Sequence, residues 1–87
     1  MIHQETVEKY SGTLAELAED IGNLKYDALA EFLRLLSLKI EQDSVKDASR
    51  GRHKLAVSLQ ECAKSLGHSS AAIERAWQIC EPYMRNN

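Results

Sequence analysis

The strongest constraint on this chain is the spacing of its large apolar side chains, which alternates between three and four residues. The first run comprises Val7, Tyr10, Leu14, Leu17, Ile21 and Leu24. Side chains at this spacing fall on one face of an α-helix. No stretch of the sequence alternates apolar and polar residues over a useful length, as a half-buried strand would. The pattern therefore predicts an all-α protein.

The first predicted helix has two possible starts and one clear end. It begins near Gln4, or at Thr13, because Thr13 followed by Glu16 is a capping-box pattern. The pair Gly22 and Asn23 is the predicted end, because both residue types tolerate positive φ.

The second predicted helix starts at Asn23 or Asp27 and has an unusually wide apolar arc. Its narrow stripe consists of Leu29, Leu33, Leu36 and Ile40. Phe32 lies close to that stripe, whereas Leu35 and Leu38 point away from it at about 100° per residue. A small bundle cannot cover so wide an arc, and exposed apolar area of this kind marks an interface. We therefore expect Phe32, Leu35 and Leu38 to contact another protein chain.

A polar stretch from Glu41 to Gly51 follows. It predicts either a hinge at Arg50 and Gly51 or a helix that passes through with Ser44 as a cap. The next stripe consists of Leu55, Leu59, Cys62 and Leu66. Gly67 is placed to end that helix.

The last predicted helix is capped by Ser69 or Ser70 and ends at Glu81, because Pro82 cannot continue it cleanly. Its inward residues are Ile73, Ala76, Trp77 and Cys80. With 87 residues the chain has room for one domain, residues 1–87. The expected architecture is a small four-helix bundle with short connections, whose seams face one another.

The residues that could carry chemistry show no pattern typical of a catalytic or metal site. The candidate metal ligands are His3, His53, Cys62, His68 and Cys80. None of them forms the closely spaced pairs that zinc sites use. The sequence contains no Gly-rich phosphate loop and no nucleophile motif. We therefore expect no metal, no cofactor and no enzymatic activity.

The apolar runs are too short for a membrane protein. The densest, residues 28–40, is interrupted by Glu31, Arg34 and Lys39, whereas a membrane span needs roughly 20 predominantly apolar residues. The N-terminus lacks the basic start and apolar stretch of a signal peptide. We expect a cytoplasmic protein without a membrane partner.

One local motif points to nucleic acid. Residues 60–77 resemble the helix-turn-helix of Cro and repressor-like DNA-binding proteins, with Ala63, Leu66, Gly67 and Ile73 at the family's spacings. The resemblance implies that the recognition helix lies within residues 69–78. It implies groove or phosphate contacts from Arg50, Arg52, Lys54, Lys64, Ser69, Ser70, Arg75 and Gln78. The same residues also fit a plain αα-hairpin that turns at Gly67.

Charge is distributed unevenly along the chain. The net charge is −2, but residues 1–43 carry four basic and nine acidic side chains, and residues 44–87 carry seven basic and four acidic ones. This asymmetry fits a basic binding face, packing of the two halves on each other, or head-to-tail association of copies.

Together these features favour a small non-enzymatic helical protein that acts through protein–protein interaction or homo-oligomerisation, in a regulatory or adaptor-like role. An isologous dimer is the commonest form of such association. The alternative is a small helix-turn-helix transcription regulator that binds DNA through residues 60–78.

Overall fold

The computed structural model describes residues 3–84, and these residues form three helices. They are α1 (Leu14–Gly22), α2 (Tyr26–Ser49) and α3 (His53–Met84). Within this range no residue lies in a β-strand. The all-α prediction is confirmed, and the prediction of a four-helix bundle is wrong. None of the helices in the described part of the chain has the length and apolar character needed to cross a membrane.

Helix α1 begins where the capping box predicted and not at Gln4. The Thr13 hydroxyl accepts a hydrogen bond from the Glu16 N–H at 3.1 Å, and the Glu16 carboxylate accepts one from the Thr13 N–H at 2.9 Å. These two bonds satisfy amides that a helix start leaves unpaired. Hydrogen bonds from Thr13 to the Glu16 carboxylate, first of all from the backbone N–H, lower the pKa of Glu16. The helix ends at Gly22 as predicted, but Asn23 has a φ of −88°, so this end does not use the left-handed region.

Helix α2 is longer than the sequence pattern suggested. It begins at Tyr26, one residue before the Asp27 start, and it passes through the polar stretch as far as Ser49. Ser44 therefore lies inside the helix and caps nothing. The break falls at Arg50 and Gly51, which was one of the two alternatives. Gly51 has a φ of +78°, a conformation that glycine adopts without steric cost.

Helix α3 contains the largest departure from the predicted architecture. It is continuous from His53 to Met84, so the predicted stop at Gly67, the caps at Ser69 or Ser70 and the end at Glu81 are all wrong. A glycine in a helix interior costs only about 1 kcal/mol relative to alanine. Gly67 lies where α3 packs along α2, close to Ser37, and the helix continues through it. Pro82 is accommodated in the last turn, where its missing N–H removes only one hydrogen bond from the helix end.

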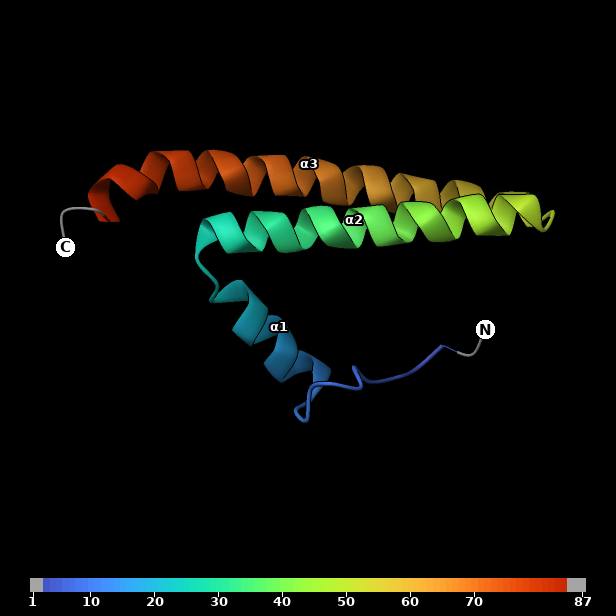
Figure 1. The fold of residues 1–87 in the computed structure, drawn as a ribbon, viewed down its shortest axis with the longest axis horizontal. Helices are drawn as coiled ribbons and strands as arrows, with labels where there is room; N and C mark the ends of the chain where they lie inside the picture. Colours follow the sequence, from blue (N-terminus) through green and yellow to red (C-terminus); the bar gives the residue numbers. More distant parts are fainter. Residues whose placement is uncertain (1–2, 85–87) are drawn as a thin grey trace.

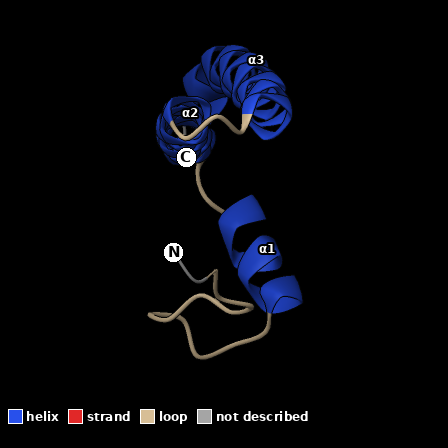
Figure 2. Cartoon of the chain, turned by 90° about the vertical axis from the view of Figure 1, so that its right-hand side faces the viewer, coloured by secondary structure: helices blue, strands red, loops and turns tan. Residues whose placement is uncertain are grey.

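Helices α2 and α3 lie side by side and antiparallel, and they form a long hairpin (Figure 1). These are the two helices that make extensive contacts with each other. We call residues 3–24, which include α1, the N-terminal arm. A view along the hairpin shows α1 standing apart from both long helices (Figure 2). The hairpin is thus one helix thick, and the arm does not close it into a bundle.

Substitution of Gly67 by alanine tests the continuity of α3. A Cβ atom built at Gly67 would have Ser37 Oγ at 3.8 Å, an ordinary van der Waals contact. We expect Gly67→Ala to raise the free energy of unfolding by about 0.5–1 kcal/mol, because alanine costs less backbone entropy in a helix. Chemical denaturation measures this change. Gly51→Ala serves as the contrast and should destabilise, because of its positive φ. A destabilising Gly67→Ala would contradict a continuous helix.

Candidate interaction surface

Small side chains form the contact between the two long helices. They recur every seven residues, at Ala30, Ser37 and Ser44 on α2 and at Ala56, Ala63 and Ser70 on α3. Five of the six are buried, and Ser37 is half-buried. We call these six residues the small-residue stripe. A seven-residue repeat keeps the same residues facing a partner helix along its whole length.

Three serine hydroxyls of the stripe cross between the helices. Ser70 donates to the Ala30 carbonyl at 2.6 Å, Ser37 to the Ala63 carbonyl at 2.7 Å, and Ser44 to the Ala56 carbonyl at 2.8 Å. In each pair one residue is alanine and the other serine. A side chain as short as serine reaches a neighbouring backbone only when the two helices approach closely, so the hydrogen bonds and the small side chains depend on each other.

This register places the larger apolar side chains on one side of the hairpin. In two antiparallel helices that share a seven-residue repeat, residues three positions after the stripe lie on the same side of the plane through both axes. The residues one position before the stripe form a second row on each helix. This row lies on the same side, farther from the helix contact. We call the resulting surface the apolar face. It consists of Leu29, Leu33, Leu36, Ile40, Leu55, Leu59, Cys62, Leu66 and Ile73.

The apolar face is only partly covered. Six of its members are half-buried, while Leu36, Leu55 and Cys62 are exposed, Leu36 at 36% and Leu55 at 47%. These residues are the stripes that the sequence analysis placed in a bundle core. They lie beside the contact between α2 and α3 and not in it, and no other helix of residues 3–84 makes extensive contacts with α2 or α3.

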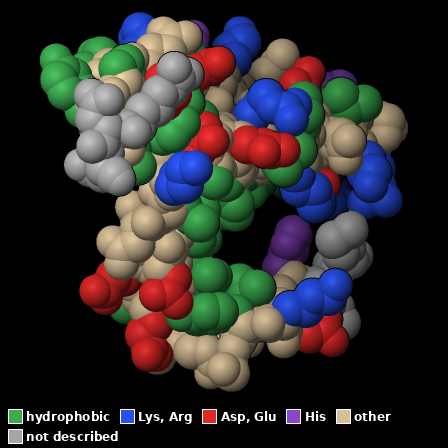
Figure 3. Space-filling view, turned by 60° about the vertical axis from the view of Figure 1, so that its left-hand side comes forward, with side chains coloured by type: hydrophobic (Ala, Val, Ile, Leu, Met, Phe, Trp, Pro, Cys, Tyr) green, Lys and Arg blue, Asp and Glu red, His purple; other side chains and the backbone are tan. Residues whose placement is uncertain are grey.

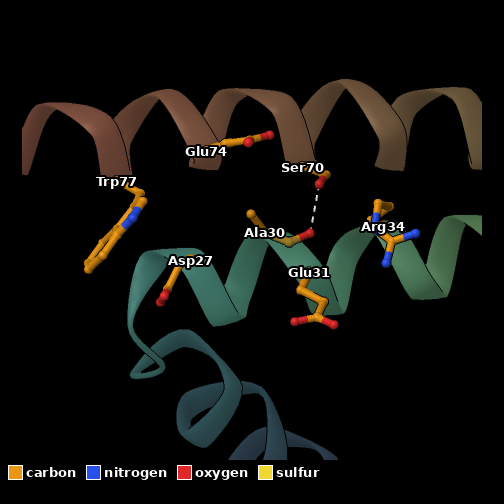
Figure 4. Close-up of a pocket in the computed structure, with 7 residues that line it drawn as sticks. All are labelled: Asp27, Ala30, Glu31, Arg34, Ser70, Glu74 and Trp77. Carbon is orange, nitrogen blue, oxygen red and sulfur yellow. Dashed lines mark hydrogen bonds between the residues drawn. The ribbon is translucent and has the colours of Figure 1, made fainter. Parts of the chain in front are cut away.

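The opposite side of the hairpin is polar next to the helix contact, and Leu38 and Val45 of α2 lie farther out on it. A shallow pocket of about 420 Å³ there is lined by Asp27, Ala30, Glu31, Arg34, Ser70, Glu74 and Trp77 (Figure 4). The Ser70 hydroxyl is already engaged with Ala30 across its floor. At its end, the Lys25 ammonium lies 5.3 Å from the centre of the Trp77 ring, a cation–π contact that ties the start of α2 to α3. No group of three or more candidate metal ligands gathers anywhere in residues 3–84.

The N-terminal arm lies on the side of the hairpin that carries the apolar face. Asp43 is in the same row of side chains on α2 as Leu29 and Leu36, seven residues apart, and its pKa is lowered first by hydrogen bonds from Lys39 and then by the charges of Lys39 and Lys46. The segment before α1 runs back below α2 toward the turn of the hairpin (Figure 1). In the space-filling view an opening separates the arm from the hairpin, and hydrophobic side chains border it (Figure 3).

The arm also has an apolar side of its own. Leu17 and Ile21 of α1 are half-buried, while Leu14 is 59% exposed. Hydrogen bonds within the arm stabilise its conformation. The Tyr10 hydroxyl donates to the Asp20 carboxylate, and this bond raises the pKa of Tyr10.

The three predicted interface residues are all exposed, at 36% for Phe32, 50% for Leu35 and 44% for Leu38. Phe32 lies one turn from Leu29 and Leu36 and borders the apolar face. Leu35 lies on the back of α2, whereas Leu38 lies on the side opposite the apolar face, where it shares a shallow groove with Val45. The structure thus separates Phe32 from the other two residues.

The predicted DNA contacts are spread over the hairpin. Arg50, Arg52 and Lys54 gather at its turn, where Arg52 pairs with Asp47 at 3.4 Å. The others lie along α3, where Lys64, Ser69, Arg75 and Gln78 are exposed. Ser70 is buried, which does not fit the DNA contact predicted for it. Lys54 and Arg75 are separated by 21 residues of one helix, about 30 Å. The turn between two helices on which the motif depends is absent at Gly67.

Comparison with known proteins adds no relative: no family model, no curated protein and no solved structure matches this chain.

Sequence reasoning missed the small-residue stripe, although its signal is present. In every bonded pair of the stripe the two residue numbers add to the same value, as antiparallel pairing requires. A search for alanine and serine at a spacing of seven would have found both halves of it.

Substitution of Ala63 tests the close contact between α2 and α3. We expect Ala63→Leu to lower the free energy of unfolding by about 1–3 kcal/mol, because the larger side chain forces the helices apart. The matched control is Ala71→Leu, on the same helix but exposed, which should have little effect. Thermal or chemical unfolding measures both. Equal effects of the two substitutions would show that Ala63 is not in a tight contact.

Proposed function

We propose that this chain is a non-enzymatic protein that acts by associating with another polypeptide, in the first place a second copy of itself, through the apolar face. A regulatory or adaptor-like role fits such a protein. The observation that carries the proposal is the composition of the core. The buried apolar residues of the described chain are three alanines, Ala30, Ala56 and Ala63, and no large side chain there is fully buried.

Surface area supports the same conclusion. The accessible surface is 7069 Å², whereas a folded monomer of 9.8 kDa exposes about 5,200 Å². The excess, about 1,900 Å², is larger than the roughly 800 Å² that each partner contributes to a standard interface. The radius of gyration is 15.8 Å, against about 12 Å for a compact domain of this length.

The physical reason is the hydrophobic effect. Burial of a leucine side chain stabilises by about 1.5–3 kcal/mol relative to full exposure. The leucines and isoleucines of the apolar face realise only part of this stabilisation in a single chain. Packing the face against another helical surface would recover the remainder.

DNA binding through residues 60–78 stays a prediction. The basic side chains at the turn of the hairpin are available for phosphate contacts. Because the helix is continuous at Gly67, the spacing of the motif gives that alternative no geometric support.

A pair of substitutions on α2 tests the proposed surface. We expect Leu36→Glu to weaken self-association by about a hundredfold, because it places a carboxylate in an apolar contact on both copies. The matched control, Leu38→Glu, puts the same charge on the side of α2 opposite the apolar face and should leave association unchanged. Light scattering across a range of protein concentrations gives the mass of each variant.

Two outcomes would contradict the proposal. One is a wild-type protein that remains at 9.8 kDa at every concentration. The other is loss of association in Leu38→Glu with none in Leu36→Glu, which would place the contact away from the apolar face, at the predicted Leu35 and Leu38.

A further inference from the structure

We infer that the N-terminal arm is a lid that closes onto the apolar face of its own chain, and that association through this face requires the lid to open. The structure holds the open state, in which α1 stands apart from both long helices (Figure 2). Within residues 3–84, α1 makes no extensive contact with either of them. Closure needs one chain only, whereas its effect on association rests on the proposed function.

The apolar residues of α1 and α2 are arranged as mirror images about the link between the two helices. The pairs are Leu14 with Leu36, Leu17 with Leu33, and Ile21 with Leu29. In each pair the two residue numbers add to the same value. Antiparallel helices pair in this way, because every residue advances both helices by the same distance. An α1 that folds back along α2 would therefore bring all three pairs together at once.

The link between α1 and α2 permits such a fold-back. It consists of residues 23–25, and two antiparallel helices are commonly joined by loops of about 2–5 residues. Helix α1 already slopes back beneath α2, with its N-terminal end toward the turn of the hairpin (Figure 1). Closure therefore requires a rotation at residues 23–25 and leaves both helices intact, because a few loop residues can absorb the change in backbone angles.

The space that α1 would enter is bordered by apolar side chains on both sides. Figure 3 shows this opening between the arm and the hairpin. The bonds across the small-residue stripe set a register that places Leu66 of α3 beside Leu33 of α2. A closed α1 would thus contact both long helices. It would supply the second layer that a helical domain needs to bury an apolar face.

The charges of the arm and of the hairpin turn also favour closure. The segment before α1 runs back below α2 toward the turn (Figure 1), and it carries Glu5 and Glu8. The turn carries Arg50, Arg52 and Lys54. These opposite charges attract the arm to the hairpin, and salt weakens that attraction.

An engineered disulfide tests closure directly. The protein carries Leu17→Cys and Leu33→Cys, with the native thiols removed by Cys62→Ser and Cys80→Ser. Two cysteines whose Cα atoms are more than about 7 Å apart cannot be bridged without movement of the backbone. In a glutathione buffer we expect a disulfide within a single chain, which mass spectrometry and a non-reducing gel detect. Circular dichroism confirms that the variant is helical.

The control for this disulfide keeps Leu17→Cys and moves the second cysteine to Leu35→Cys, on the back of α2. We expect it to remain reduced under the same conditions. Equal bridging of the two variants, or no bridging of the first, would contradict closure in the predicted register. A disulfide between two chains would also overturn the inference, because the arm would then cover the face of another copy.

A charge on the arm tests the competition with association. Leu17→Glu places a carboxylate on the apolar side of α1 and should prevent closure. Because the apolar face is then always open, self-association should become about threefold tighter or more. The matched control, Ala15→Glu, puts the same charge on an exposed position that points away from Leu17 and should leave association unchanged. Light scattering measures both proteins.

The outcomes separate the lid from the proposed function. If the disulfide forms within one chain but neither the wild type nor Leu17→Glu associates, closure stands and the proposed function fails. If Leu36→Glu disrupts association but the disulfide does not form, the lid is overturned and association through the apolar face stands. If the disulfide forms and Leu17→Glu associates no more tightly than the wild type, the competition is overturned.

Discussion

Three serine hydroxyls that donate to backbone carbonyls of the facing helix set the distance between α2 and α3, and the remaining architecture follows from that distance. The bonds from Ser37, Ser44 and Ser70 are 2.6–2.8 Å long. They require the small-residue stripe, because a larger side chain at any of these positions would hold the helices apart. A hairpin built this way is closely packed but contributes little apolar area to its own core.

As a consequence, the large apolar side chains are not buried between α2 and α3. With alanine and serine between the helices, leucine and isoleucine occupy the side of the hairpin and form the apolar face. The arm does not cover that face, although it lies on the same side and has an apolar seam of its own. Exposure of Leu36 and Leu55 is therefore a result of the close helix contact and not a local irregularity.

The sequence predicts local features of this fold better than its assembly. Thr13 and Glu16 identify the start of α1 because a capping box is a short-range pattern, and Gly51 marks the turn because positive φ is a backbone requirement. The predicted helix end at Gly67 is wrong because glycine is compatible both with a helix end and with a close helix contact. The facing Ser37, which is distant in sequence, shows that Gly67 lies at a helix contact. The leucine stripes predicted core seams between helices, but the small-residue stripe occupies that contact and the leucines lie beside it, half-buried or exposed.

If the apolar face is buried against a second copy, as we propose, folding of the chain is coupled to dimerisation. The concentration dependence of the thermal midpoint tests this claim directly, since folding coupled to dimerisation is favoured by mass action. Over a hundredfold range of protein concentration, the midpoint should rise by about 5–10 °C. A midpoint that stays constant over that range would contradict the claim and would show that one chain is stable with its apolar face exposed.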